Sequence, residues 1–298
     1  MKMIRAPFLS LAIIFTPVTL AMAWDRGYLN PFDAVLTFIG VLCLHASANT
    51  FNNYFDYKSG IDVITIPTPF SGGSKILPNK EIKPESALKL ASGLLAIGAV
   101  IGIYFSFIRF EFTSYGWIIA TLLLVSAISI YFYSTKFASW GLGELFVGLN
   151  FGPLLSMGVY YVQARTISLE PILVGTVLGI LTAGVLYINE FPDYDADKSK
   201  GRYHLIVRMG KDKATKGFKV LMISAYALII LGVISQVTPF TTLIGLVTLP
   251  LAIKASKILD KNYDSPVALI PGMASTIICT LLTGVTLTIA YLISGFLL

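Results

Sequence analysis

Long apolar segments alternate with shorter polar segments along the whole chain. Several apolar segments exceed the roughly 18 residues that mark a transmembrane α-helix. Prolines in the last two segments are compatible with membrane helices, because neighbouring groups can satisfy the freed carbonyls. The pattern predicts an all-α membrane protein with nine transmembrane helices, at about residues 7–24, 32–54, 86–108, 115–133, 142–163, 169–190, 218–237, 240–258 and 268–296.

The polar segments between these helices differ in length and in charge. If the N-terminus and the segments after helices two, four, six and eight share one side, that side carries 19 basic residues and the other carries 3, which accounts for all 22. Because cytoplasmic connections are enriched in Lys and Arg, we expect a plasma-membrane protein with a cytoplasmic N-terminus and an external C-terminus. The alternative of a secretory signal cleaved after Ala21–Ala23 is less simple, because the apolar run is long for a signal.

Composition supports a membrane protein and excludes a nucleic-acid-binding one. Apolar residues make up 55% of the 298 residues and charged residues 13%, about half the usual charged share. The net charge of +6 therefore indicates membrane topology rather than a nucleic-acid footprint. Cys43 and Cys279 lie in apolar segments without a partner at metal-binding spacing, so we expect two buried free thiols.

A polar pattern occurs twice, each time where a predicted helix meets a long polar segment. It reads Asn, any residue, aromatic, any residue, Asp, Tyr, at residues 52–57 and 189–194. Because the copies are four helices apart, we expect two related four-helix halves, residues 1–140 and 141–264, plus a ninth helix at 265–298. All belong to a single membrane domain of residues 1–298.

Helical spacing places the polar residues of the first copy on one face. At about 100° per residue, the side chains fall within an arc of about 60°. Lipid does not accept such a stripe, so it must face the protein interior or a water-filled cavity. The residues of this stripe are His45, Asn49, Asn52 and Asp56.

In the second copy Asn189, Asp193 and Asp197 share one helical face, and Asp195 points away from it. Pro192 disfavours helix at the residue before it, so these carboxylates either continue a helix or lie on irregular backbone that lines a cavity. We expect the first copy to be the more rigid ligand set. We expect the second copy, with the basic segment that follows it, to bind the ligand.

Carboxylate and amide oxygens suit Mg²⁺, which binds one or two carboxylates together with substrate phosphates. Two such sets would hold two ions and one diphosphate, and the backbone of residues 71–75 would add N–H groups. Nearby cations for the phosphate charge are Lys58, Lys75, Lys136, Lys198, Lys200 and Arg202. Alone, each feature has a simpler explanation: an Asp as a helix cap, a Lys as a topology signal, and His45 as a buried hydrogen-bonding residue. The repeated combination favours a metal–diphosphate site.

These motifs resemble the UbiA superfamily of intramembrane prenyltransferases, which carry two Asp-rich motifs after the second and sixth of nine helices. The first motif, with Asp62 six residues after Asp56, is similar to the branch that prenylates dihydroxynaphthoate for menaquinone. The chain departs from that branch at Asn53, at the additional Asp195, and in residues 64–75, which contain no arginine. Further similar segments are Tyr133–Lys136, Gly143–Glu144, Phe151–Pro153, Tyr160–Gln163, Asp193–Arg202 and Val207–Gly210.

The resemblance implies nine helices around a central cavity that opens to the bilayer and is capped by polar loops. It implies Mg²⁺-dependent transfer of a prenyl group from an isoprenyl diphosphate to an aromatic quinone precursor, with release of pyrophosphate. The implied metal ligands are Asn52, Asp56, Asn189, Asp193 and Asp197; the diphosphate contacts are Arg5, Asn49, Lys75, Lys198 and Arg202; and the catalytic residues are Asp56, Asp62, Tyr133, Lys136 and Asp193.

Within that reaction, aromatic faces would stabilise the allylic cation that forms as the diphosphate leaves. Tyr54, Tyr133 and Tyr187 are the candidates for this role, and Asp62 is the candidate for accepting the proton.

Three alternatives remain open at the level of sequence. The acceptor of the prenyl group could be a glycerol phosphate lipid instead of an aromatic ring. A phosphotransferase acting on CDP-activated alcohols would concentrate its acids in one continuous motif, whereas here they are divided between two helices. A cation transporter would place its ligands near the membrane midplane, whereas these lie at the rim beside many lysines.

Overall fold

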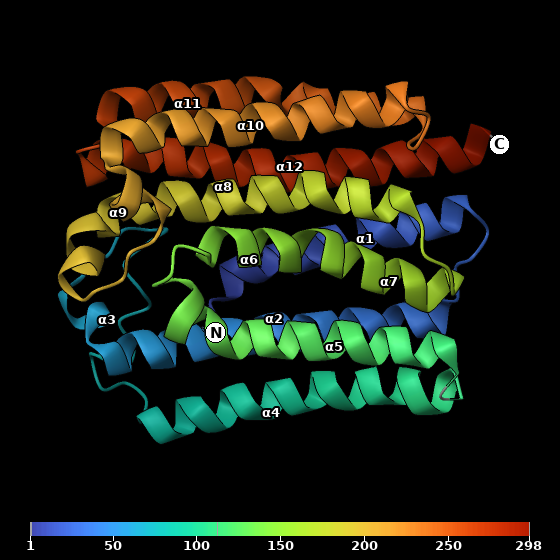
Figure 1. The fold of residues 1–298 in the computed structure, drawn as a ribbon, viewed down its shortest axis with the longest axis horizontal. Coiled ribbons are helices and arrows are strands. Elements are labelled where there is room, and N and C mark those ends of the chain that lie inside the picture. The colour runs from blue at the N-terminus through green and yellow to red at the C-terminus, as the bar shows by residue number, and fades with distance from the viewer. Residues whose placement is uncertain (1, 112, 298) are drawn as a thin grey trace.

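A computed structural model describes residues 2–111 and 113–297, and every regular element in these residues is helical. Nine segments of the described chain are long and apolar enough to cross a membrane, as the sequence predicts, and they run lengthwise in one bundle (Figure 1). They are Ala6–Asp25 (ending with α1, Ser10–Asp25), α2 (Pro31–Ser59), Pro84–Arg109 (beginning with α4, Pro84–Ile103), Ser114–Phe137 (beginning with α5, Ser114–Phe132), Gly143–Ala164 (α6, Gly143–Leu149, and α7, Leu155–Ala164), α8 (Leu169–Ser199), α10 (Lys211–Ile234), Phe240–Asn262 (ending with α11, Leu249–Asn262) and α12 (Pro266–Leu297).

Several helices extend beyond the apolar segments that predict them. α2 continues to Ser59, α8 continues to Ser199, and α10 begins at Lys211 rather than at residue 218. The apolar pattern marks the part of a helix inside the bilayer, whereas polar residues at its end are equally compatible with helix. The ninth helix ends at Leu297, and its predicted last residue, 298, lies outside the described residues.

One proline can now be placed, and one expectation about a cysteine needs correction. Pro250 lies in the first turn of α11, after a 3-10 segment at Phe240–Thr248, so it begins a helix there. Cys279 is a buried free thiol as expected, but Cys43 is a free thiol that is only half-buried. Apolar neighbours in the sequence do not distinguish a protein-facing position on a membrane helix from a more exposed one.

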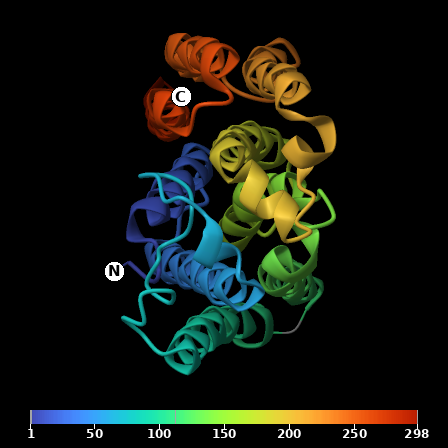
Figure 2. The same ribbon diagram turned by 90° about the vertical axis from the view of Figure 1, so that its left-hand side faces the viewer.

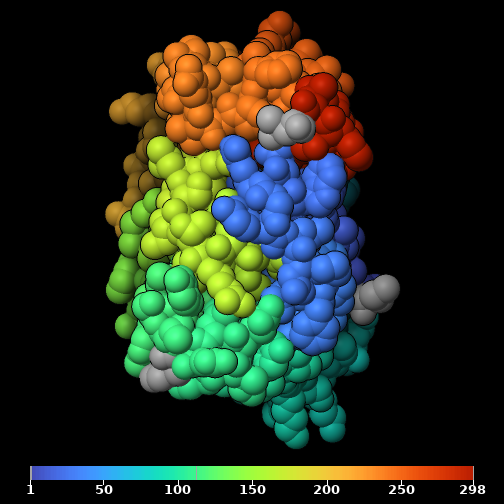
Figure 3. Space-filling model, turned by 90° about the vertical axis from the view of Figure 1, so that its right-hand side faces the viewer, coloured from blue at the N-terminus to red at the C-terminus, as the bar shows by residue number. Residues whose placement is uncertain are grey.

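The connections divide between the two ends of the bundle (Figure 1). The N-terminal segment and the connections after the second, fourth, sixth and eighth membrane helices lie at one end, and the C-terminus lies at the other. We call the first end the acidic end; it is where α2 and α8 terminate. In Figure 2, which faces the acidic end, the loop at 60–83 with α3 (Ile61–Ile64) lies over α2, across from α9 (Leu205–Met209). Figure 3 faces the opposite end, where the α1–α2 and α7–α8 connections meet and Arg26 donates to Glu170 at 3.0 and 3.2 Å.

α8 forms the centre of the bundle. In its most apolar stretch 72% of the residues are buried, the highest share among the nine membrane segments of the described chain. It packs with α10, α11 and α12 in one apolar cluster and with α1, α7 and α12 in another. Neighbouring helices therefore hold α8 on several sides along its length.

Paired glycines allow α8 to approach α6 and the turn after it very closely. A Cβ on Gly179 would lie 2.2 Å from the carbonyl oxygen of Gly148, and a Cβ on Gly152 would lie 2.6 Å from that of Gly175. Small residues four apart on facing membrane helices permit such backbone contact. This contact draws the polar start of α6 toward the last turns of α8.

A cavity of about 640 Å³ lies between α2, α5, α7 and α8. Its deeper walls are apolar, with Leu44, Ile101, Leu122 and Val159 among the lining residues. Its polar lining residues gather at the acidic end, under the loop at 60–83. The fold therefore forms an apolar chamber with a polar mouth. The relation between the two four-helix halves stays a prediction.

Candidate active site

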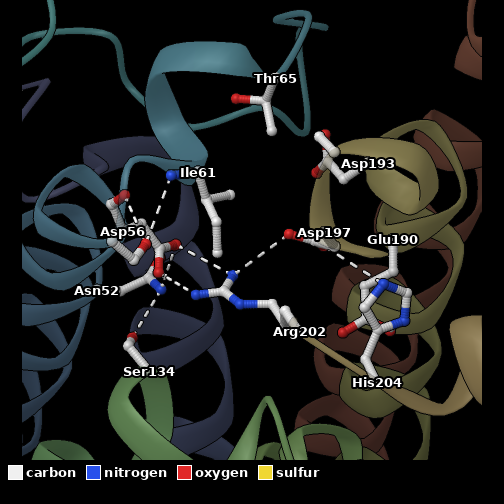
Figure 4. Close-up of polar contacts among 12 residues, drawn as sticks. Asn52, Asp56, Ile61, Thr65, Ser134, Glu190, Asp193, Asp197, Arg202 and His204 are labelled. Carbon is white, nitrogen blue, oxygen red and sulfur yellow. Dashed lines mark hydrogen bonds and ion pairs between the residues drawn. The ribbon is translucent and has the colours of Figure 1, made fainter. Parts of the chain in front are cut away.

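α2 carries the first acidic set at its last turns. The helix continues through Asp56 and stops at Gly60, whose φ of 78° is a left-handed conformation suited to glycine. The amide of Asn52 donates to Asp56 Oδ2 at 2.9 Å and to Ser134 Oγ at 2.8 Å (Figure 4). Because both amide N–H groups are used, the carbonyl oxygen of Asn52 is the group left for a further ligand.

α8 carries the second acidic set and remains helical through Pro192 to Ser199. The alternative of irregular backbone at this point is therefore wrong. A proline inside a helix costs about 3 kcal/mol, which the packing of α8 against its neighbours offsets. As a result Asn189, Asp193 and Asp197 follow one another at successive turns, and all three line the cavity.

Arg202 joins the two sets across the mouth of the cavity (Figure 4). Its guanidinium forms a close ion pair with Asp56 and lies 3.9 Å from Asp197 Oδ1. The side chain of Arg202 is 13% exposed and that of Asp56 is 7% exposed. Burial alone would lower the pKa of Arg202, but the charges of Asp56 and Asp197 outweigh it and raise the pKa above its ordinary value.

The acidic set on α8 contains buried oxygens without hydrogen-bond partners. These are the Oδ1 atoms of Asn189, Asp193 and Asp197, whereas Asp193 Oδ2 accepts the N–H of Gly72 at 3.2 Å. Such an acceptor costs about 1–3 kcal/mol when nothing binds it. Three oxygens without hydrogen bonds on one face, opposite Asn52 and Asp56, match the hard ligands that Mg²⁺ prefers. The residues present therefore fit a magnesium site.

The loop at 60–83 covers this mouth and holds Asp62 beneath it. Asp62 is 3% exposed and lines the cavity, and a Cβ on Gly73 would lie 2.1 Å from its Oδ1 atom. Burial, followed by the charge of Asp56, raises the pKa of Asp62 to about 6. The expected phosphate-binding N–H groups of 71–75 are partly engaged, because Gly72 donates to Asp193.

Four further residues singled out in the sequence line the cavity: Arg5, Asn49, Tyr133 and His45. Arg5 donates to the Asn53 side chain at 3.0 and 3.1 Å, and Asn49 donates to the backbone oxygen of Ile4 at 3.0 Å. His45 is buried edge-on against a phenylalanine ring, with ring centroids 4.5 Å apart, and its Nδ1 has no hydrogen-bond partner. The expectation of a buried histidine is confirmed.

Three predicted lysines lie outside the cavity lining. The ammonium groups of Lys136 and Lys198 rest over aromatic rings, at 5.5 Å from Phe132 and 5.7 Å from Tyr194. Lys75 instead closes its own loop by donating to Thr65 O at 2.6 Å and Thr65 Oγ1 at 2.9 Å. Cation–π contact and loop closure explain these positions, which sequence spacing does not reveal.

Two of the three candidate aromatic residues also lie away from the cavity, which corrects their expected role. Tyr187 is buried, and its hydroxyl donates to the backbone oxygen of Ala214 at 3.0 Å. Tyr54 packs against a small apolar cluster that contains Ile76. Among the three, Tyr133 alone lines the cavity, because α5 ends there in a π-helical turn.

A buried cluster beside the mouth is not evident from the sequence. It consists of Glu144 at the start of α6, Glu190 on α8 and His204 before α9, with one ligand atom from each lying within 4.8 Å of the others. Glu190 lies next to Asn189 in the second motif, and Glu144 begins an apolar segment. Nothing in the sequence around His204 marks it as part of a site. Its contact with Glu190 arises because the loop after α8 folds back onto that helix.

The fold and the site together define a class of protein: a multi-pass membrane protein with an apolar chamber and an acidic, metal-compatible mouth. Residues 12–271 match the UbiA prenyltransferase family, and the chain belongs to this family of prenyl-transferring enzymes.

Known relatives agree with this assignment over nearly full length. The chain is 27% identical to the 1,4-dihydroxy-2-naphthoate octaprenyltransferase of Escherichia coli over 99% of this chain and 95% of that protein. An apo UbiA homologue of Aeropyrum pernix has a TM-score of 0.69 at 18% identity, over 92% of this chain and 96% of that one. A UbiA homologue of Archaeoglobus fulgidus bound to GPP and Mg²⁺ has a TM-score of 0.60 at 15% identity, over 97% and 99%. The similarity extends to the menaquinone-type branch expected from the motifs.

Proposed function

We propose that this protein transfers a prenyl group from an isoprenyl diphosphate to a dihydroxynaphthoate-type aromatic acceptor, with Mg²⁺ as cofactor. The observation that carries the proposal is the convergence of two oxygen-rich helix ends on one mouth above an apolar chamber. The naphthoate prenyltransferase named among the relatives supports the acceptor. The homologue bound to GPP and Mg²⁺ supports the donor and the ion.

In this proposal Mg²⁺ would be held by Asn52 and Asp56 on α2 and by Asn189, Asp193 and Asp197 on α8. When bound, it would supply positive charge that stabilises the leaving diphosphate. Arg202 and Arg5 are cationic groups on the cavity wall and supply further contacts to the phosphates. Lys75, Lys136 and Lys198 would have to leave their present partners to do the same.

The chamber below the mouth binds the prenyl chain and excludes water from the allylic carbon. Its walls include Leu44, Ile101 and Leu122, and Tyr133 presents an aromatic ring close to the mouth. An electron-rich ring attacks the allylic carbon, the carbon–oxygen bond to the diphosphate breaks, and a proton or carbon dioxide leaves the acceptor. Asp62, buried beside the mouth, is the proposed proton acceptor in the first case.

We propose further that the acidic end faces the cytoplasm and that the C-terminus lies outside. Of the 22 basic residues, 19 belong to the N-terminus and the connections at this end by the grouping given above. Membrane insertion retains such segments on the cytoplasmic side.

The test is a product screen with the purified chain in lipid. Prenyl diphosphates of several lengths are offered with dihydroxynaphthoate, hydroxybenzoate and a glycerol phosphate lipid, and products are read by mass together with pyrophosphate. We expect prenylated naphthoate as the product. Asp193→Asn should abolish its formation, whereas Asp195→Asn should retain it, because the Asp195 carboxylate is exposed on the same helix. A prenylated glycerol phosphate lipid would overturn the acceptor, and full activity of Asp193→Asn would overturn the metal assignment.

A further inference from the structure

Behind the mouth lies a group of buried, ionisable side chains that the proposed reaction does not use. Glu144 is 3% exposed, Glu190 is 8% exposed and His204 is fully buried. They come from three separate elements, α6, α8 and the segment before α9. The glycine contacts between α6 and α8 bring the two glutamates together, and the turn after α8 places the histidine between them and Asp197.

Four polar atoms of this group are buried without hydrogen-bond partners. Glu144 uses one carboxylate oxygen to accept the N–H of Leu205 at 3.0 Å, and its other oxygen accepts nothing. Glu190 Oε2 and both ring nitrogens of His204 are likewise buried without a hydrogen bond. An unpaired buried carboxylate is costly, so two of them beside one imidazole must hold a proton or bind a cation.

The contact between His204 and Glu190 has the geometry of two ligands beside an ion. His204 Nδ1 lies 3.4 Å from Glu190 Oε2, close enough for an ion pair, yet the contact is not an aligned hydrogen bond. Two ligands about 2.1 Å from a tetrahedral ion are separated by about 3.4 Å and do not point at each other.

The other side of the imidazole ring completes the pattern. His204 Nε2 faces Asp197 Oδ2 at 3.3 Å (Figure 4). Metal-binding histidines typically present their second nitrogen to a carboxylate, which fixes the orientation of the ring. Glu190 also lines the cavity, which gives an ion a route into the buried cluster.

We propose that Glu144, Glu190 and His204 form a second metal site, for a divalent transition metal such as Zn²⁺, separate from the Mg²⁺ site of the two motifs. An imidazole ligand favours such an ion over Mg²⁺, which prefers oxygen ligands throughout. Asp197 contacts His204 of one site and belongs to the ligand set of the other. Metal bound at His204 therefore orients Asp197 toward the mouth of the cavity.

The test measures metal binding and does not depend on prenyl transfer. The full chain is purified in detergent without a histidine affinity tag. It is dialysed against a buffer that contains excess Mg²⁺ and no transition metals, and is then titrated with Zn²⁺. We expect about one tightly held Zn²⁺ per chain, by elemental analysis and competition with a chelating dye. X-ray absorption of the complex should show nitrogen and oxygen ligands and no sulfur.

The two histidines of the chain give a matched pair of variants. His204→Gln and Glu144→Gln should each weaken Zn²⁺ binding by about tenfold or more. His45→Gln should not, because His45 lies on α2 and is not a member of the cluster. Asp193→Asn, which alters the proposed Mg²⁺ site, should also leave Zn²⁺ binding intact.

Three results would overturn the proposal. The first is that the wild-type chain binds no Zn²⁺, Mn²⁺ or Fe²⁺ in excess Mg²⁺ and that Zn²⁺ does not change its melting temperature. In that case the cluster holds a shared proton only. The second is equal affinity for Zn²⁺ in wild type, His204→Gln and His45→Gln. The third is sulfur coordination of the bound ion. The wild-type measurement decides the question even where a variant fails to fold.

Discussion

Arg202→Gln removes a cation that contacts both acidic helix ends and leaves their carboxylates facing one another. Arg202 and Asp56 are 13% and 7% exposed, so water screens little of their interaction. Breaking a pair of this kind by removing one partner costs about 3–5 kcal/mol, because the remaining charge stays buried. We therefore expect Arg202→Gln to lower the free energy of unfolding by about 3 kcal/mol in the absence of divalent cations.

The same reasoning predicts how Mg²⁺ changes this loss. A divalent ion bound between Asp56 and Asp197 replaces the missing positive charge, so Mg²⁺ should stabilise Arg202→Gln more than it stabilises wild type. The assay is the midpoint of unfolding in detergent, with and without Mg²⁺ and pyrophosphate. Arg109→Gln is the matched control, because Arg109 pairs with the buried Asp33 at 2.9 Å at the opposite end of the bundle.

An equal gain from Mg²⁺ in wild type and both variants would refute the reasoning, because the mouth would then not be a cation site. In activity, Arg202→Gln should lose about 10²-fold or more in kcat, the typical cost of removing one preorganised donor from a developing anion. Arg202→Lys should recover part of the stability but little of the activity, since an ammonium lacks the planar donor pair.

Further predictions concern the loop over the mouth and the metal. Gly73→Ala should lower prenyl transfer more than about tenfold, because its Cβ would lie 2.1 Å from Asp62; Gly201→Ala, at a similar φ of 75° with nothing within 4 Å, should affect activity much less. The pKa of Asp62 is raised from 3.8 to about 6, so the folded protein keeps this carboxyl protonated where the unfolded chain ionises it. The free energy of unfolding of the wild type should therefore fall as the pH rises from about 4 to 6. Asp62→Asn should abolish that slope and raise the unfolding free energy at pH 7 by at most about 3 kcal/mol. EDTA should abolish transfer reversibly, and Asp193→Asn should shift the Mg²⁺ concentration needed to restore it; unchanged Mg²⁺ dependence would contradict this.

Most of the fold is predictable because each membrane helix corresponds to an apolar segment of similar length in the sequence. A run of apolar residues has few alternatives in a bilayer, so nine segments and the ends at which they connect follow from hydropathy and charge. The polar extensions of α2 and α8 do not follow, because helix outside the bilayer carries no apolar signal. The clustering of Asn52, Asp56 and Asp193 is predictable for a similar reason: a polar stripe on a membrane helix must face an interior.

The basic residues are less predictable than the acidic ones. A lysine near a phosphate site and a lysine that retains a loop in the cytoplasm look alike in the sequence. In the structure Lys136 and Lys198 rest on aromatic rings, whereas Arg202 reaches both acidic sets. The difference arises from the turn after α8, which directs one side chain inward, and such a turn leaves no periodic signal.

The continuation of α8 through Pro192 links these observations. On a helix, the motif positions 189, 193 and 197 face the cavity, and the intervening Glu190 is rotated by about 100° from Asn189 toward α6. A break at the proline would have released that register for Asp193 and Asp197, which follow it, and would have moved the turn that carries His204 away from Glu190. One helical register thus sets both the acidic mouth and the buried cluster behind it, so a change in either is transmitted through Asp197 and His204, which are in direct contact.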